Sequence, residues 1–155
     1  METHAYNVVV KWTGDLGHGT ANYSAYERNH EIKVEGKPSL LGSSDAAFRG
    51  DPSRWNPEDS LLSSISACHM LWFLHIASEV GWVVRSYVDR AHARMQMNAN
   101  GSGQFVSAHL RPEVEISSGD PSISDRLHHR AHDMCFIARS LNFDILCDAS
   151  VTKRA

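Results

Sequence analysis

Alternating apolar and polar residues predict strands near both ends of the chain and through much of its second half. The N-terminal stretch YNVVVKW is β-branched and aromatic, and two later stretches alternate over enough residues to form long strands joined by the turn NANGSG. A final short run alternates in the same way. The predicted strands are residues 6–12, 21–26, 30–36, 82–99, 104–117 and 143–153.

A helical pattern of apolar residues replaces this alternation between Pro57 and Val80. Asn56 is a suitable N-cap, proline suits the first helical position, and two acidic residues follow in the first turn. Gly81 suits the C-terminal end of the helix. Apolar side chains cover nearly the whole circumference, which predicts a helix that is buried on all sides. A chain this short struggles to surround such a helix alone, and this suggests a second subunit.

A second helix is expected to begin at Ser122 or Ser124 and to run to about Leu141. Before the first helix, residues 37–54 form a predicted irregular link that is rich in Pro, Gly, Ser and Asp. The order β-β-β-α-β-β-α-β contains no regular βαβ alternation, so we expect an α+β fold. The length of 155 residues suits a single domain over residues 1–155.

Composition narrows the function classes. With 42% hydrophobic and 21% charged residues the chain is typical of a globular protein, and a net charge of −3 gives no electrostatic footprint for nucleic acid. Histidine, glutamate and serine interrupt the longest apolar run, so we interpret it as a core helix and expect no membrane association. Three cysteines form no secreted disulfide framework, which favours a reducing cytoplasm.

The three cysteines occupy different patterns. Cys68 lies mid-helix, and packing in a core is the simplest role for a free cysteine there. Cys135 is expected in the middle of the second helix, again as a packing residue or as half of a redox pair with Cys68. Cys147 alternates with apolar residues on one strand face and is predicted to be core.

The histidines offer weaker indications. His128 and His132 share a helix face at i and i+4, and Cys135 follows one turn later, a spacing that zinc can use. We favour a solvated helix face there and expect no metal and no cofactor. His75 is expected to be a core or interface residue. His69 is a candidate for contact with a substrate, or with the Cys68 region of a partner subunit.

The segment RWNPEDSLLSSISACHM resembles the OsmC/Ohr family, named for osmotically inducible protein C and the organic hydroperoxide resistance proteins. In that pattern Asn-Pro-Glu opens a long helix and Ala-Cys follows about ten residues later, as at residues 56–58 and 67–68 here. A second cysteine on a later helix matches Cys135, and an arginine in the preceding loop matches Arg49 in AFRGD. The resemblance covers the whole chain, including the order of elements.

This resemblance implies an intertwined homodimer with two long central helices. It also implies a stress-response peroxidase that reduces organic hydroperoxides, with Cys68 as the peroxidatic cysteine and Cys135 as the resolving one. The two would form a disulfide that a small dithiol reductant reopens. Arg49 and Glu58 would tune the thiolate.

Helix geometry adds a condition to that assignment. Glu58 and Cys68 are separated along their helix by about 15 Å, so they cannot share a site within one helix. An antiparallel partner helix would bring Glu58 of one subunit towards Cys68 of the other. We therefore expect active sites at a dimer interface, with Trp72 and Phe136 among the apolar residues that contact the substrate.

The chain also departs from the family pattern. His69 stands where phenylalanine usually follows the first cysteine, and Phe136 stands where proline usually follows the second. Arg54 competes with Arg49 for the arginine role. A non-catalytic dimer that binds a small apolar or thiol ligand remains an alternative. A cysteine hydrolase is disfavoured, because Cys68 and His69 are adjacent on a helix and point apart.

Overall fold

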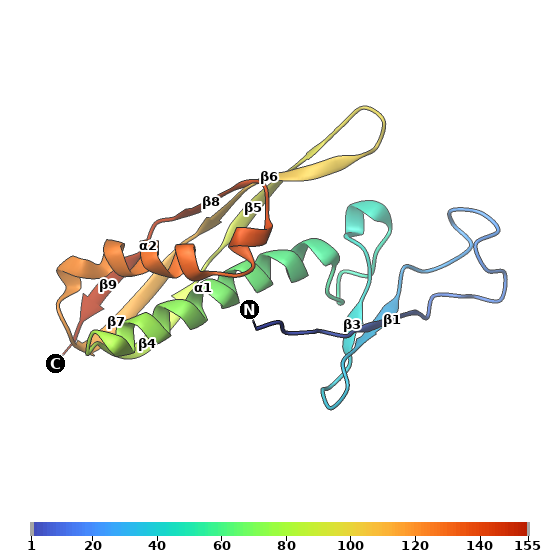
Figure 1. The fold of residues 1–155 in the computed structure, drawn as a ribbon. Helices are drawn as coiled ribbons and strands as arrows, with labels where there is room; N and C mark the ends of the chain where they lie inside the picture. The colour runs from blue at the N-terminus through green and yellow to red at the C-terminus, as the bar shows by residue number, and fades with distance from the viewer. Residues whose placement is uncertain (1, 155) are drawn as a thin grey trace. The chain divides into compact units, whose positions relative to one another are not determined.

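The computed structural model describes residues 2–154, in two compact units that meet in sequence between Leu61 and Leu62. It confirms the α+β class, and the expected order of elements holds when strands that bend are counted once (Figure 1). The prediction of a single domain over residues 1–155 stays a prediction. The main elements are β1 (Val9–Trp12), β2 (His30–Lys33), β3 (Leu40–Gly42), α1 (Pro57–Glu79), β4 (Val83–Asp89), β5 (His92–Met97), β6 (Gly103–Leu110), β7 (Pro112–Ser118), α2 (Ser124–Met134), β8 (Asp144–Cys147) and β9 (Ser150–Lys153).

The first unit contains an antiparallel sheet in the order β1-β2-β3. The prediction of a strand over residues 21–26 is wrong. The Asn22 side chain accepts hydrogen bonds from the backbone N–H and the hydroxyl of Ser24, and the resulting turn competes with strand pairing. The third strand is β3, which lies inside the segment predicted to be an irregular link. A short 3₁₀ helix, η1 (Ala46–Phe48), follows it.

The helix α1 begins where the sequence predicts. The Asn56 side-chain oxygen accepts a hydrogen bond of 2.7 Å from the backbone N–H of Asp59, as an N-cap does. The helix ends at Glu79, and Gly81 adopts a φ of 79°, a left-handed conformation that glycine accommodates without strain.

The cap gives a stability prediction. Replacing Asn56 by alanine leaves the N–H of Asp59 without its acceptor, and we expect the free energy of unfolding to fall by about 1 kcal/mol. Urea denaturation would measure it, with Asn142→Ala as an exposed control that caps no helix. Equal losses in the two variants would contradict the capping role.

The single chain buries α1 only in part, whereas the sequence predicts a helix that is buried on all sides with the help of a second subunit. Its buried residues are Ile65, His69, Phe73, Ile76 and Ala77. Leu71, in contrast, is 63% exposed. Length and composition alone would allow α1 to cross a membrane, but its buried side chains pack into the core of the second unit.

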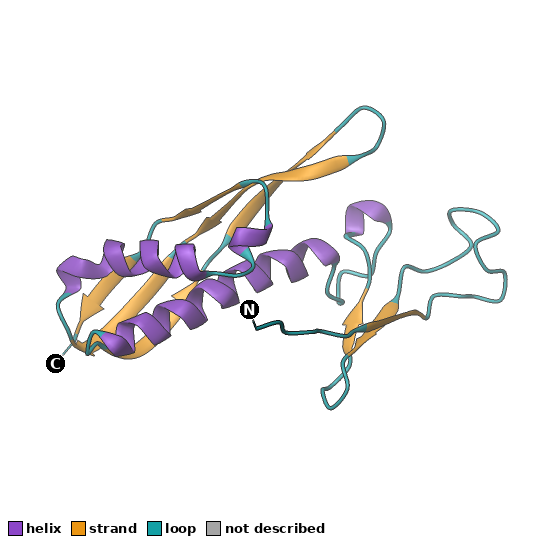
Figure 2. Ribbon diagram, in the orientation of Figure 1, coloured by secondary structure: helices purple, strands orange, loops and turns teal. Residues whose placement is uncertain are grey.

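The second unit has two sheets, β4-β7-β9 and β5-β6-β8, because each of the three predicted C-terminal strands is divided in two. The first division follows Asp89, whose carboxylate accepts a hydrogen bond from the backbone N–H of Arg111 at 2.7 Å. Pro112 follows Arg111 and has no N–H for a continuous ladder. The predicted long strands therefore bend, and each contributes to both sheets (Figure 2).

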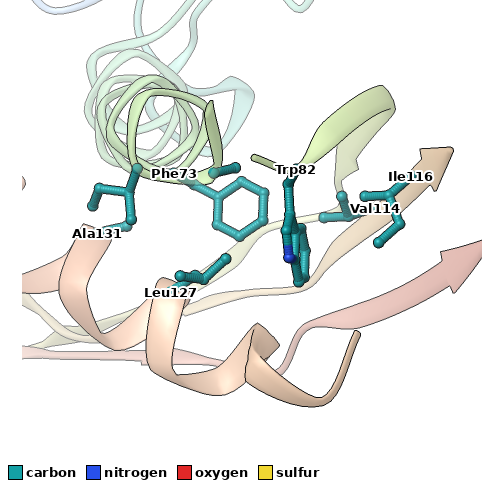
Figure 3. Packing of buried hydrophobic residues seen from close by; sticks show 8 residues of the cluster. Phe73, Trp82, Val114, Ile116, Leu127 and Ala131 are labelled. Carbon is teal, nitrogen blue, oxygen red and sulfur yellow. The ribbon is translucent and has the colours of Figure 1, made fainter. Parts of the chain in front are cut away.

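Both helices contribute to one hydrophobic core with the sheet β4-β7-β9. Phe73 of α1 is fully buried between Leu127 of α2 and Trp82, which precedes β4 (Figure 3). The other core members are Ile76, Ala77, Val114, Ile116 and Ala131. This packing fixes the face that each helix turns towards the other, and with it the position of the functional side chains.

Candidate thiol site

The structure brings Cys68 and Cys135 together within the second unit. Cys68 is half-buried in the middle of α1, and Cys135 is fully buried directly after α2. The two thiols lie close enough for Cys68 to raise the pKa of Cys135. Both are free thiols, so the pair is a dithiol in this structure.

The prediction that Cys135 lies in the middle of a helix is wrong. The helix α2 ends at Met134, and Cys135 is extended, with φ −70° and ψ 108°. A tight turn follows: the backbone N–H of Arg139 donates to the Cys135 carbonyl at 3.0 Å, and a 3₁₀ helix forms at Ala138–Ser140. The segment contains no glycine or proline to signal this end, so the sequence pattern alone continues to Leu141.

The turn also surrounds the Cys135 sulfur. The backbone N–H of Ala138 donates to Sγ at 3.4 Å. Burial raises the pKa of the Cys135 thiol to about 11, the neighbouring Cys68 contributes in the same direction, and the backbone N–H groups of Ala138 and Ile137 partly offset both effects. Cys135 is therefore protonated at neutral pH and is a poor nucleophile in this state.

Two aromatic residues lie beside the thiols. Trp72 follows Cys68 by one helical turn, and Phe136 directly follows Cys135. Their rings meet edge to face with centroids 5.5 Å apart, a favourable aromatic arrangement. Because Phe136 is 66% exposed, the dithiol is bordered by an apolar surface that a ligand can reach.

His69 faces away from this pair. Its side chain is 1% exposed, and its Nε2 lies 3.0 Å from Nδ1 of His128 and 3.8 Å from Sγ of Cys147. The prediction of a solvated face is wrong for His128, which is buried. His75 is exposed and pairs with Glu79 at 3.4 Å, so the prediction that it is a core residue is wrong, and its possible interface role stays a prediction.

The grouping of His69, His128 and Cys147 was not predicted from the sequence. Cys147 is half-buried on β8, as the alternating pattern indicates, but its polar neighbours come from distant segments. His69 and His128 are 59 positions apart, and His69 and Cys147 are 78 apart. No local sequence motif predicts such a grouping, because it depends on how α1, α2 and β8 pack.

Arg49 and Glu58 belong to the first unit. Arg49 is exposed and has a φ of 64°, which is uncommon for a residue other than glycine. Within residues 2–154 Arg49 has no ion pair, whereas Arg54 pairs with Asp51 at 3.4 Å. One carboxylate oxygen of Glu58 is buried and has no hydrogen-bond partner among the described residues.

The α+β fold thus brings together two free cysteines, Cys68 on α1 and Cys135 directly after α2. The family model for OsmC-like proteins matches residues 50–149, which include Cys68 and Cys135. The chain therefore belongs to the OsmC-like family. A search of curated proteins found no match.

Solved structures share the fold over nearly the whole chain. An OsmC-like protein of unknown function from Vibrio cholerae is 26% identical, with a TM-score of 0.86 over 96% of this chain and 100% of that one. An organic hydroperoxide resistance protein from Elizabethkingia anophelis is 17% identical, with a TM-score of 0.66 over 99% and 100%. The organic hydroperoxide resistance protein OhrB of Bacillus subtilis is 15% identical, with a TM-score of 0.64 over 95% and 98%.

Proposed function

We propose that the protein is a thiol-dependent peroxidase that reduces organic hydroperoxides. The observation that carries the proposal is the proximity of Cys68 on α1 and Cys135 directly after α2, which lie close enough to interact. Structural relatives named as organic hydroperoxide resistance proteins support the same reaction class.

The reaction uses both thiols in sequence. The Cys68 thiolate attacks one oxygen of the peroxide bond, which breaks to give a Cys68 sulfenic acid and an alkoxide that takes up a proton as the alcohol. The Cys135 sulfur then attacks the sulfenic sulfur, and a Cys68–Cys135 disulfide forms with loss of water. A small dithiol reductant in the cytoplasm returns both cysteines to thiols by exchange.

The surroundings of the two sulfurs support this division of roles. Cys135 is fully buried, and its pKa is raised to about 11, so it is protonated when a hydroperoxide arrives. Cys68 is only half-buried, so a hydroperoxide can reach it more readily. A protonated, buried thiol beside the attacking sulfur suits the resolving role.

Arg49 and Glu58 complete the proposed site. Arg49 has no carboxylate partner among residues 2–154, and Glu58 has a buried oxygen without a hydrogen bond. A guanidinium and a carboxylate in these states suit a fork-shaped pair that holds the arginine near a thiolate. We propose that Glu58 comes from the partner subunit, since it is remote from Cys68 along α1 by about 15 Å.

A homodimer is part of this proposal. All four residues of β1 are exposed, including Val9 and Val10 at 63% and 62%. Leu71 on α1 is equally exposed, at 63%. A monomer rarely leaves so much apolar surface in contact with water, and a second copy of the chain would cover it.

The aromatic pair favours organic substrates over hydrogen peroxide. Trp72 and Phe136 give the dithiol an apolar border, and an alkyl or aryl group on the hydroperoxide gains contact area there. Hydrogen peroxide has no such group. We therefore expect faster oxidation of Cys68 by an organic hydroperoxide than by hydrogen peroxide at equal concentration.

Peptide mapping after brief oxidation tests the proposal. Fully reduced protein would receive one equivalent of cumene hydroperoxide or of hydrogen peroxide, with Cys68→Ser as the matched control. We expect a Cys68–Cys135 disulfide, more of it with the organic peroxide, and a Cys147 that stays reduced because burial and nearby aspartates raise its pKa to about 12. If both thiols remained reduced, the non-catalytic ligand-binding alternative would be favoured.

A further inference from the structure

We propose that His69, His128 and Cys147 form a binding site for a divalent transition-metal cation of the Zn²⁺ type. Their ligand atoms all lie within 4.8 Å of one another, and they come from α1, α2 and β8 of the second unit. The site shares no residue with the Cys68–Cys135 pair, so it is independent of the proposed peroxidase.

The distances suit such a cation. Zn²⁺ binds imidazole nitrogen at about 2.0–2.1 Å and thiolate sulfur at about 2.3 Å in tetrahedral geometry, which separates two nitrogens by about 3.3 Å and a nitrogen from a sulfur by about 3.6 Å. His69 Nε2 and His128 Nδ1 are 3.0 Å apart, and Cys147 Sγ is 3.8 Å from His69 Nε2. Small tilts of the rings would bring all three atoms to bonding distance.

The donor types select the cation. Two imidazoles and a thiolate are borderline and soft ligands, which suit zinc and copper and do not suit magnesium or calcium. His69 and His128 are 1% and 4% exposed. Their nitrogens are therefore already out of contact with water, and binding a cation costs them no hydration. Phe73 stacks on the His128 ring at a centroid distance of 4.1 Å and holds its orientation.

The hydrogen bonding of the two rings is incomplete. A ring nitrogen on each, Nδ1 of His69 and Nε2 of His128, is buried without a hydrogen-bond partner among the described residues. Buried polar atoms in folded proteins nearly always have partners, so this cluster is under-satisfied as it stands. A cation bound between the rings would replace the single hydrogen bond between the facing nitrogens, His69 Nε2 and His128 Nδ1, by two metal–nitrogen bonds.

An entry path and a favourable charge are both present. His128 and Cys147 line a pocket of about 600 Å³ together with Asp125, His129, His132 and Asp148. The negative charges of Asp89, Asp148 and Asp125 act on Cys147, where they oppose a thiolate and favour a cation. A bound divalent ion would outweigh the aspartates and favour the Cys147 thiolate, because coordination deprotonates a thiol outright.

Binding balances without any electron transfer. In the metal-free pair, the facing N–H of one imidazole donates a hydrogen bond to the facing nitrogen of the other. When the ion binds both facing nitrogens, that proton moves to the outer nitrogen of the same ring. Cys147 releases its thiol proton, so each cation bound liberates one proton. The fourth position can be taken by water or by His132, which lines the same pocket.

The test uses the full chain with Cys68→Ser and Cys135→Ser, in which Cys147 is the remaining thiol. Equilibrium dialysis against Zn²⁺ should give one ion per chain. Co²⁺ should give a thiolate-to-cobalt charge-transfer band in the near ultraviolet and the visible bands of a four-coordinate ion. Adding Cys147→Ser should abolish the charge-transfer band and weaken binding by at least about a hundredfold, since even outer-shell changes cost ten- to a hundredfold.

Two further measurements distinguish this site from binding by exposed histidines. His128→Gln should weaken binding to a similar degree, and His75→Gln, which replaces an exposed histidine on α1, should not. Because replacing a buried histidine threatens the fold, ¹⁵N spectra of the histidine rings in the otherwise intact chain give a readout without that substitution, and the His69 and His128 signals should respond to Zn²⁺. Failure to bind, or binding that survives Cys147→Ser, would overturn the proposal.

Discussion

A Cys68→Ser variant is expected to lose organic hydroperoxide reduction by at least about a thousandfold, because loss of a nucleophile removes the reaction path itself. A serine hydroxyl is isosteric with the thiol but is not a nucleophile towards the peroxide bond. Steady-state consumption of cumene hydroperoxide with dithiothreitol as reductant would measure the loss. The fold should be unchanged, since Cys68 is half-buried and the substitution leaves its volume nearly the same.

Cys135→Ser separates the two roles. Given one equivalent of hydroperoxide and no reductant, this variant should still be oxidised at Cys68, which is unchanged, and should accumulate as a sulfenic acid instead of a disulfide. Mass spectrometry of the intact protein distinguishes the added oxygen atoms from a disulfide. Full turnover by Cys68→Ser, or a first turnover that needs Cys135, would contradict the assignment.

Phe73→Ala is expected to lower the free energy of unfolding by about 3–5 kcal/mol, since it empties a fully buried aromatic position. Phe73 lies in the core between the two helices and the sheet (Figure 3). Its ring packs against the rings of Trp82, Tyr87 and His128. Its removal leaves a cavity that these rigid neighbours cannot fill. Urea denaturation at one fixed protein concentration would measure the change.

Phe136→Ala is the matched control for that prediction. It removes the same group from a side chain that is 66% exposed, and we expect a loss of about 1 kcal/mol or less. A similar loss in both variants would show that the core of the second unit does not depend on Phe73. Phe136→Ala should lower the peroxidase activity more than Phe73→Ala does, because Phe136 borders the dithiol and Phe73 does not.

Local signals explain which elements could be predicted. The start of α1 depends on Asn56 and Pro57, which act within one turn of chain, and both ends of α1 lie within a residue of the prediction. The pairing of Cys68 with Cys135 was expected because the family resemblance supplied it. The helical pattern alone left Cys68 and Cys135 either as packing residues or as a redox pair.

Non-local interactions explain what the sequence pattern missed. The predicted long strands bend where Asp89 binds the backbone of Arg111, 22 positions away, and alternation continues undisturbed across that point. The end of α2 at Met134 has no glycine or proline to mark it. The cluster of His69, His128 and Cys147 exists only after two helices and a strand have packed.

The adjacency of Cys68 and His69 on α1 has a consequence for how such proteins diverge. Successive residues on a helix point about 100° apart, so these neighbours in sequence contact different partners, Cys135 on one side and His128 on the other. Residues around Cys68 can therefore change without altering the surroundings of His69, and the reverse also holds. Inserting a single residue between His69 and Phe73 would instead rotate both away from their partners at once, because Phe73 holds the rest of the helix in the core. We therefore expect related chains to vary freely in the chemistry of either face while the length of this helical segment stays fixed.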